Sequence, residues 1–285
     1  MINTDIILII TALTALIFAT IVDIRIKEVP DWISFSLIAT GLIIRLMHSI
    51  IFTDWPFFFY GLLGLGATFL IGNLLYHANQ WGGGDAKLLM GLGATLSTKP
   101  FYLAESNIPF LATLFILILI AGAFYGVIWS ISLIVKNFKK FKLEFKHLLT
   151  TRKSYVLQTT SMIASVILLV LIFFVDSTSL KLAIFILAVL LAIYFYLFAA
   201  VKSIENIHFF KKIPVENLVE GDWIAQDVKL RNKIVLTKRT TLEKKQISEL
   251  KKLNIKQVLI KEGIPFVPPF LIGTIIALLI GNPFI

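Results

Sequence analysis

The amino-acid sequence predicts an all-α polytopic membrane protein with about eight transmembrane helices and a small cytoplasmic α+β module. Two observations predict this fold class. The chain has 285 residues, of which 58% are hydrophobic and 15% charged, whereas soluble domains average about 45–50% apolar and ~25% charged residues. The apolar residues also gather in runs of about 20, the length that a helix needs to cross the bilayer core. This composition argues against a soluble enzyme, a disordered tail or a nucleic-acid binder.

Eight apolar segments are predicted to span the membrane, at residues 5–22, 32–52, 57–76, 84–97, 108–135, 155–175, 180–200 and 265–282. The fourth is short and begins in glycines, while the fifth is long enough to tilt or to project beyond the bilayer. The first carries Asp5 where a signal peptide would be basic, so it is interpreted as a true span.

The basic residues predict the orientation of these spans. Of the 27 basic residues, 24 lie on one side of the predicted membrane, two on the other, and Arg45 lies within the second span. Because Lys and Arg concentrate in cytoplasmic loops of plasma-membrane proteins, the basic side is predicted to be cytoplasmic, with both termini outside. The net charge of +10 is then explained by topology, and no nucleic-acid partner is predicted. Arg45 is interpreted as a side chain that reaches from the span to the outer face.

Five parts are predicted along the chain, namely a catalytic transmembrane core of five spans at 1–135, a basic interfacial helix at 136–154, an additional transmembrane hairpin at 155–200, a small cytoplasmic module at 201–264 and a C-terminal transmembrane helix at 265–285. In the interfacial segment, apolar residues recur at helical spacing among lysines, at Phe138, Phe141, Phe145 and Leu148. This pattern is typical of a helix on anionic lipid headgroups. A cytoplasmic loop with some apolar residues is the alternative.

The polar module is predicted to combine strands and a helix. Residues 222–237 indicate a β-hairpin, from Asp222-Trp223-Ile224 to Ile234-Val235-Leu236. Thr240 and Glu243 have capping-box spacing before a helix through about Leu253, and 255–260 indicate a strand. Sixty or so residues is marginal for an independent fold. No catalytic constellation is visible in the module.

Two carboxylates stand at the ends of apolar spans, where charge is costly and therefore suggests function. Asp23 ends the first span and Asp85 opens the fourth. The first span runs from outside to inside and the fourth starts inside, so both carboxylates are predicted at the cytoplasmic face and at a similar depth. Two facing carboxyls can share a proton, with one acting as general base on water and the other as general acid. This is the chemistry of an aspartic protease.

Gly82, Gly83 and Gly84 precede Asp85 and allow close backbone approach and a positive φ. Exposed main chain there is predicted to pair with an extended substrate. Asp85 lies at a helix N-terminus, which favours its anion, and Asp23 at a helix C-terminus, which disfavours it. We therefore hypothesise that Asp23 more often holds the shared proton, although the pair titrates as a unit.

Each of these residues also has a simpler interpretation. Asp23 and Asp85 are each compatible with a helix cap, and the glycines with a turn. Arg25 is also compatible with the cytoplasmic bias of basic residues alone, and Lys87 either reaches to the interface or acts on the Asp85 carboxylate. No metal or other cofactor is predicted, because the chain has no cysteine and its four histidines show no ligand spacing.

At these residues the chain resembles the type IV prepilin peptidases, and most of all the archaeal preflagellin (prearchaellin) peptidase branch of these GxGD membrane aspartic proteases. The first resemblance is Asp23-Ile24-Arg25 followed by Val29-Pro30-Asp31. The second is Gly82-Gly83-Gly84-Asp85-Ala86-Lys87-Leu88-Leu89-Met90, which is similar to the family's G-x-G-D motif with its D-x-K-L-L continuation. The third is the approach to the last span, residues 261–269.

The resemblance implies that Asp23 and Asp85 are the catalytic aspartates, with Gly82, Gly83, Gly84, Arg25 and Lys87 as substrate-binding or motif residues. It also implies cleavage of class III signal peptides from archaellin or type IV pilin precursors at the cytoplasmic face. Such precursors carry a basic segment, a Gly before the scissile bond and an apolar helix. The bacterial cysteine tetrad is absent from this chain, so N-methylation of the product is not inferred.

Three alternatives remain at this point. Presenilin-like and signal-peptide-peptidase-like proteases share G-x-G-D, but they place the first aspartate after a Tyr on the preceding span, whereas Asp23 follows Val22 and lies three spans earlier. A proton-coupled transporter can use intramembrane carboxylates and glycine-broken helices, although no inverted repeat is visible. A regulatory role through the 201–264 module is a third option.

Overall fold

The computed structural model describes residues 4–78, 80–104, 106–219, 221–230, 233–237, 242–253 and 255–283. The chain forms two compact units. Unit 1 contains residues 1–127 and 263–285, and unit 2 contains residues 128–262. Helix α5, Phe110–Lys136, therefore contributes its first part to unit 1 and its last part to unit 2.

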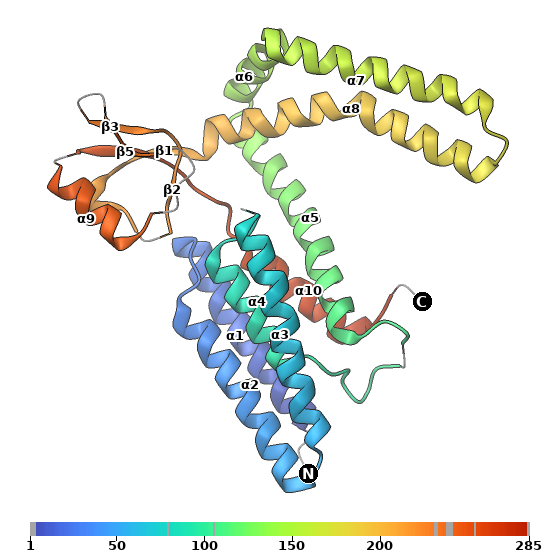
Figure 1. Cartoon of the computed structure of the whole chain (residues 1–285), viewed down its shortest axis with the longest axis vertical. Helices are drawn as coiled ribbons and strands as arrows, with labels where there is room; N and C mark the ends of the chain where they lie inside the picture. Colours follow the sequence, from blue (N-terminus) through green and yellow to red (C-terminus); the bar gives the residue numbers. More distant parts are fainter. Residues whose placement is uncertain are drawn as a thin grey trace. The chain divides into compact units, whose positions relative to one another are not determined.

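Unit 1 is a bundle of apolar helices (Figure 1). Besides the first part of α5, it contains α1 Thr4–Ile26, α2 Asp31–Phe52, α3 Trp55–His77, α4 Gly83–Thr95 and α10 Val267–Ile280. Leu16, Leu88, Leu92, Leu114 and Phe270 are fully buried in its core. Because α1 and α3 run in the same direction and α2 and α4 run oppositely (Figure 1), the end of α1 and the start of α4 lie at the same end of the bundle.

Small residues bring α3 and α4 into close contact. Gly61, Gly64 and Gly72 are buried on one face of α3, and a Cβ at Gly72 would lie 3.3 Å from the Cβ of Ala86 on α4. Faces of small residues are typical of membrane helices that pack with their backbones close together. The position of α4 is therefore closely defined by α3.

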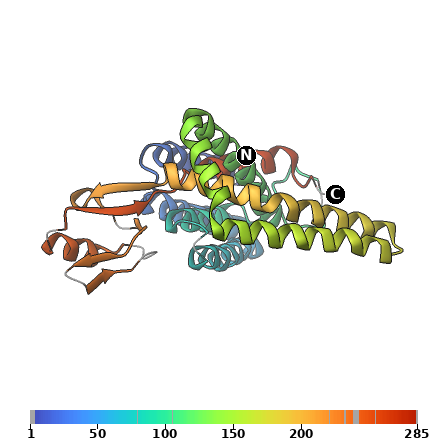
Figure 2. The same ribbon diagram turned by 90° about the horizontal axis from the view of Figure 1, so that it is seen from above.

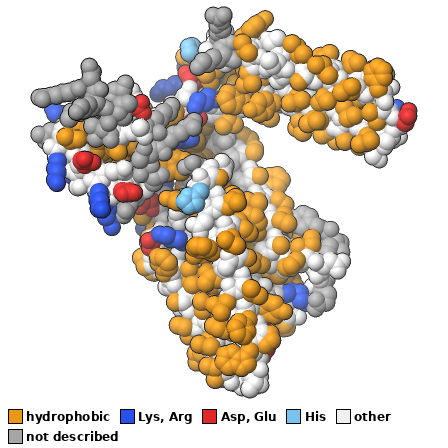
Figure 3. Space-filling view, viewed as in Figure 1, with side chains coloured by type: hydrophobic (Ala, Val, Ile, Leu, Met, Phe, Trp, Pro, Cys, Tyr) orange, Lys and Arg blue, Asp and Glu red, His pale blue; other side chains and the backbone are white. Residues whose placement is uncertain are grey.

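The prediction of an all-α polytopic membrane protein is confirmed. Six of the described helices are long and apolar enough to cross a membrane, and hydrophobic side chains cover the visible faces of unit 1 and of α7–α8 (Figure 3). The predicted spans at 84–97 and 265–282 form the shorter helices α4 and α10, with 13 and 14 residues. At about 1.5 Å per residue each is about 20 Å long, against a bilayer core of about 30 Å.

One end of α2 carries local strain that can be relieved. Thr53, the C-cap residue of α2, has a φ of 56°. The left-handed region costs a non-glycine residue about 1–2 kcal/mol, and β-branched residues are genuine outliers there. We expect Thr53→Gly to raise the Tm of the purified protein, by a gain in unfolding free energy of about 1 kcal/mol. Thr40→Gly, inside α2, is the control and should lower the Tm; a Tm for Thr53→Gly below that of the unmodified protein would contradict the prediction.

Unit 2 begins with three helices. After α5 follow α6 Phe138–Thr150, α7 Arg152–Leu171, a 3-10 turn at Ile172–Phe174, and α8 Thr178–His208. α7 and α8 lie side by side as a hairpin (Figure 2), and the hydroxyl of Ser165 donates a hydrogen bond of 2.9 Å to the carbonyl of Ala188 between them. α8 continues past the predicted end at residue 200, so the polar module begins after His208.

The module has more strands than the sequence predicts, and they pair differently. Its strands are β1 Phe210–Pro214, β2 Trp223–Ile224, β3 Val228–Leu230, β4 Lys233–Leu236 and β5 Gln257–Lys261. The predicted hairpin between β2 and β4 is wrong. β2 pairs antiparallel with β5, and β4 pairs with β3. β1, which the sequence analysis missed, also pairs with β5.

Helix α9, Lys244–Lys252, covers the module core. Its capping box joins Glu243 and Gln246 rather than the predicted Thr240 and Glu243, and Thr240 lies outside the described residues. Ile247 and Leu250 of α9 are buried with Ile224, Val258 and Ile260 of the sheet. A compact apolar core therefore supports the strands.

Candidate active site

Asp23 lies in the last turn of α1 and is buried, with 4% of its surface exposed. Its Oδ2 accepts a hydrogen bond of 2.8 Å from the backbone N–H of Val267, and the backbone N–H of Phe266 also donates to the carboxyl. These N–H groups belong to the N-cap and first residue of α10. Asp23 therefore joins the C-terminal end of α1 to the N-terminal end of α10.

Asp85 lies in the first turn of α4 and is partly exposed. Its Oδ2 accepts a hydrogen bond of 3.2 Å from the backbone N–H of Gly82, which is the N-cap residue of this helix. Asp85 is thus the third residue of the helix rather than the N-cap, and its carboxyl binds the backbone N–H of the N-cap residue. This bond satisfies one of the donors that a helix start leaves without a partner.

The glycine run does not use the positive φ that is available to glycine. α4 already begins at Gly83, and Gly82 is extended, with φ −71° and ψ 158°. The positive-φ glycines among the described residues are Gly221 and Gly281. Close approach does occur, because a Cβ at Gly84 would lie 2.9 Å from the Cβ of Val29.

This approach brings the two aspartate-bearing segments together. Val29 lies in the connection between α1 and α2, six residues after Asp23, and Gly84 directly precedes Asp85. The two carboxyls are close enough to interact electrostatically. The topology predicted from basic residues thus places Asp23 and Asp85 at one end of the bundle, as the structure does.

The sequence predicts that helix dipoles favour the anion of Asp85 and disfavour that of Asp23, but the structure removes this difference. Asp23 ends α1, but its carboxyl also receives the N–H groups at the start of α10. Helix N-termini favour a carboxylate. Both carboxyls therefore lie at helix N-termini, and the macrodipole no longer favours Asp23 as the residue that holds the shared proton.

Of the two predicted basic site residues, Lys87 forms an ion pair with an aspartate other than Asp85. The Nζ of Lys87 forms a 2.6 Å ion pair with Oδ1 of Asp31 and lies 5.6 Å from the ring centroid of Phe35 on α2. Lys87 thus links α4 to α2. Arg25 is exposed in the last turn of α1.

Several residues near the aspartates were missed by the sequence analysis. Trp81, which precedes the glycine run, is buried and packs against Phe266 and Phe270, with ring centroids 5.9 and 5.2 Å away. It therefore couples the segment before Asp85 to the start of α10 that binds Asp23. Tyr125 of α5 interacts electrostatically with Asp23. The resemblance at residues 261–269 was a sequence signal for Phe266, whereas no pattern singled out Trp81 or Tyr125.

The arrangement offers proton-transfer chemistry. One buried and one partly exposed carboxyl interact, and both are oriented by backbone N–H groups. Such a pair can hold one proton between two acids, leaving one as base and the other as acid. Over the described part of the chain, no group of three or more His, Asp or Glu side chains gathers as a candidate metal-ligand set.

Comparison with known proteins points to a peptidase family. Residues 10–131 match the model of the Type IV leader peptidase family. This segment contains Asp23, Asp85 and the contact between Gly84 and Val29. The match therefore covers both aspartates, but not the start of α10 whose N–H groups bind Asp23.

Three curated proteins are similar to part of the chain. The preflagellin peptidase of Methanococcus maripaludis is 30% identical over 127 residues, which are 43% of this chain and 55% of that protein. The preflagellin peptidase of Methanocaldococcus jannaschii is 28% identical over 127 residues, 43% of this chain and 54% of that protein. Prepilin peptidase EppA of Methanothermobacter thermautotrophicus is 29% identical over 104 residues, 36% of this chain and 26% of that protein. The matches to the two preflagellin peptidases span about half of those proteins.

Proposed function

We propose that this chain, whose residues 10–131 match the Type IV leader peptidase family, is an aspartic endopeptidase of that family. Its substrates are archaellin or type IV pilin-like precursors, from which it removes class III signal peptides. The observation that carries the proposal is that the carboxyls of Asp23 and Asp85 lie close enough to interact, with Gly84 packed against Val29, within the segment that matches the family. The names of the similar proteins support the substrate class.

In this proposal the two carboxyls divide the acid and base roles. One carboxylate takes a proton from a water molecule, and the water oxygen attacks the scissile carbonyl carbon. The other carboxyl gives its proton to the carbonyl oxygen, which forms a tetrahedral gem-diol. The first carboxyl then passes the proton it took from water to the leaving amine as the C–N bond breaks, and a hydroxyl proton of the gem-diol returns to the second carboxyl. The backbone N–H groups at Asp23 and Asp85 hold the carboxyl oxygens in place during both steps.

The proposed location is the plasma membrane, with the site at the cytoplasmic face. Support comes from the predicted topology, in which 24 of the 27 basic residues lie on the side of the aspartates. The precursor's basic segment and Gly would remain at this face while its apolar helix lies in the bilayer. Gly82 is exposed and extended, but its N–H donates to Asp85 and its carbonyl oxygen accepts from the N–H of Ala86, so it does not supply the main-chain pairing that the sequence predicts for an extended substrate.

The direct test uses the full-length protein, purified and reconstituted in lipid. It is mixed with a precursor that has a basic segment, a Gly and an apolar helix, and the products are identified by mass spectrometry. We expect one cut directly after the Gly. An intact precursor together with proton uptake into vesicles would instead favour the transporter, whereas cuts within the apolar helix would favour the presenilin-like alternative.

We also propose that α6 rests on anionic lipid headgroups. The predicted apolar face of α6 is largely used within unit 2, since Phe141 and Phe145 are half-buried and stack 5.6 Å apart, and Glu144 accepts a 2.7 Å hydrogen bond from Asn206 of α8. The exposed side chains of α6 that remain for the membrane include Phe138, Leu143, Lys139, Lys140, Lys142 and Lys146. Lysines near an anionic surface contribute about 1 kcal/mol each.

A fluorescent probe on α6 tests this contact, since the chain has no native cysteine. We expect an environment-sensitive dye on Leu143→Cys to emit at shorter wavelength in phosphatidylglycerol nanodiscs than in phosphatidylcholine nanodiscs. Replacing Lys139, Lys140 and Lys142 by Gln should remove this difference. A dye on Ser248→Cys of α9 is the control, and equal emission from α6 in both lipids would rule out the contact.

A further inference from the structure

We propose that Arg45 is a positioning residue for Asp85, because it fixes the short helix α4 along its axis from the opposite end. The inference rests on the proposed function, in which Asp85 must meet both Asp23 and the substrate. It departs from the sequence prediction that Arg45 reaches the outer face, since Arg45 is fully buried, with 0% of its surface exposed.

The need for such a residue follows from the length of α4. Its 13 residues end inside unit 1 among buried residues, where the last carbonyls of a helix have no partner within the helix. Unsatisfied backbone groups at membrane depth are costly. A short helix inside a membrane protein therefore needs donors at its C-terminal end.

Arg45 supplies these donors from the neighbouring helix α2. Its Nε donates a 2.9 Å hydrogen bond to the carbonyl of Ala94, and its Nη2 donates at 2.9 Å to the carbonyl of Thr95 and at 3.0 Å to Oγ1 of Thr98. Its Nη1 donates at 2.9 Å to the carbonyl of Phe57 on α3. Ala94 and Thr95 are the last two residues of α4, and a cation there also complements the helix dipole.

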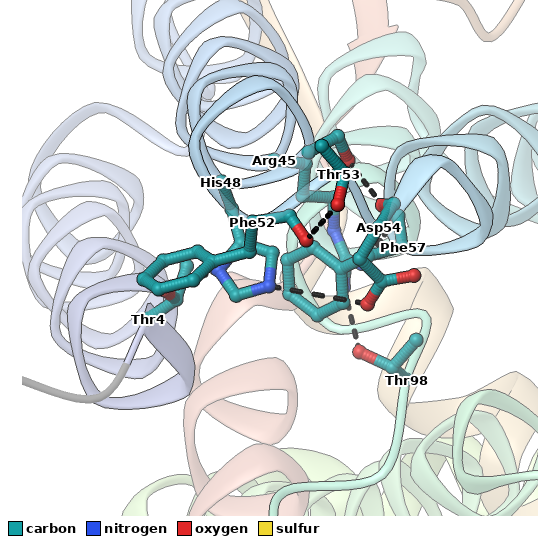
Figure 4. A network of polar contacts seen from close by, with 9 residues as sticks. Thr4, Arg45, His48, Phe52, Thr53, Asp54, Phe57 and Thr98 are labelled. Carbon is teal, nitrogen blue, oxygen red and sulfur yellow. Dashed lines mark hydrogen bonds and ion pairs between the residues drawn. The ribbon is translucent and has the colours of Figure 1, made fainter.

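The surroundings of Arg45 leave the guanidinium little freedom. The guanidinium lies 4.4 Å from the ring centroid of Phe57, which in turn lies 4.5 Å from the ring of His48 (Figure 4). A Cβ at Gly61 would lie 2.5 Å from Cδ of Arg45, so only glycine leaves space for this side chain. Asp5 acts on Arg45 electrostatically and accepts a hydrogen bond from the backbone of Phe101. Arg45 is thus held by packing as well as by hydrogen bonds.

α4 is consequently held at both ends. Arg45 binds its C-terminal carbonyls, and Gly84 packs against Val29 beside Asp85. Because a helix transmits an axial shift along its length, a displacement at the Arg45 end moves Asp85 relative to Asp23. A misplacement of about 1 Å can reduce a catalytic rate about 100-fold.

The position of α4 can be measured apart from activity. Cysteines at Gly72 and Ala86 would have Cβ atoms about 3.3 Å apart, close to the about 3.5–4.5 Å of a disulfide, and the chain has no other cysteine. We expect the rate of cross-linking between Gly72→Cys and Ala86→Cys in the reconstituted protein to fall at least threefold on adding Arg45→Lys. This substitution retains the charge but loses the planar set of donors.

Gly61→Ala is the second variant, since it keeps Arg45 and only displaces it. Gly66→Ala in the same helix is its matched control, because a Cβ there would meet nothing within 4 Å. In the native cysteine-free background, Arg45→Lys and Gly61→Ala should each lower kcat, by about 10- to 100-fold, with KM within about twofold of the unmodified protein. Gly66→Ala should change neither kcat nor KM.

Each combined result for cross-linking and kcat either supports or overturns the positioning role of Arg45. A fall in both cross-linking and kcat supports the proposal. A fall in kcat without a change in cross-linking overturns the proposal, and so does a change in cross-linking without a fall in kcat. If Arg45→Lys does not fold, Gly61→Ala decides, and the proposal is overturned when that variant changes neither kcat nor the cross-linking rate. If the unmodified protein cleaves no precursor, the proposed function fails, and the cross-linking rates still decide whether Arg45 sets the position of α4.

Discussion

Asp23→Asn and Asp85→Asn are each expected to reduce precursor cleavage by roughly 10²–10⁴-fold or more, since each variant removes one of the two proton-transfer groups. Asn keeps the shape of the side chain and can still accept the N–H groups of Val267 and Gly82. The fold should therefore persist while the acid–base function is lost. The measurement is kcat of the reconstituted variants on the basic–Gly–apolar-helix precursor.

Asp54→Asn is the matched control for these two variants. Asp54 precedes α3 at the end of unit 1 that holds Arg45 and His48, and its carboxyl lies 3.9 Å from Nε2 of His48. Its substitution should leave kcat within about twofold, because no proton transfer depends on it. Retention of the unmodified rate by either Asp23→Asn or Asp85→Asn would remove that residue from the mechanism.

Gly84→Ala is expected to have the second largest effect. Its Cβ would lie 2.9 Å from Cβ and 3.1 Å from the carbonyl oxygen of Val29, so α4 must move away from the connection after α1. This movement separates Asp85 from Asp23, and we expect kcat to fall about 10- to 100-fold. Single-turnover cleavage by the purified variant is the measurement.

Gly83→Ala is the paired comparison for Gly84→Ala. A Cβ at Gly83 would lie 3.6 Å from Cε2 of Tyr76, an ordinary contact. Alanine also suits the first turn of a helix better than glycine. Activity should therefore stay near that of the unmodified protein. Equal losses from the two substitutions would show that the close contact with Val29 does not set the geometry of the site.

Local sequence patterns predicted the helices and the approach of the aspartates. Hydropathy marked the segments that became helices, because a long apolar run has few alternatives to a helix in a membrane. Charge asymmetry then assigned the ends of α1 and α4 to one side. These two patterns were sufficient to bring Asp23 and Asp85 together without any knowledge of packing.

The contacts that complete the site depend on long-range packing and could not be predicted. The hydrogen bond between Asp23 and Val267 joins residues 244 positions apart, and nothing near Asp23 in the sequence indicates α10 as its partner. The burial of Arg45 likewise depends on residues far away in the sequence, because its side chain on α2 packs against Gly61 of α3 and binds the carbonyl at the end of α4. In the module, the two-residue strand β2 pairs with β5 across a gap in sequence, which a local hairpin pattern does not reveal.

The pH dependence of kcat tests most directly whether Asp23 and Asp85 act as one catalytic pair. A pair that works with one shared proton loses activity both when the second proton binds and when the shared proton leaves. We predict a bell-shaped profile for the unmodified protein, with both limbs belonging to the two carboxyls. The residual activity of Asp23→Asn and of Asp85→Asn should lack the bell shape, since each variant keeps only one carboxyl. A profile without any limb attributable to a carboxyl would contradict the catalytic pair.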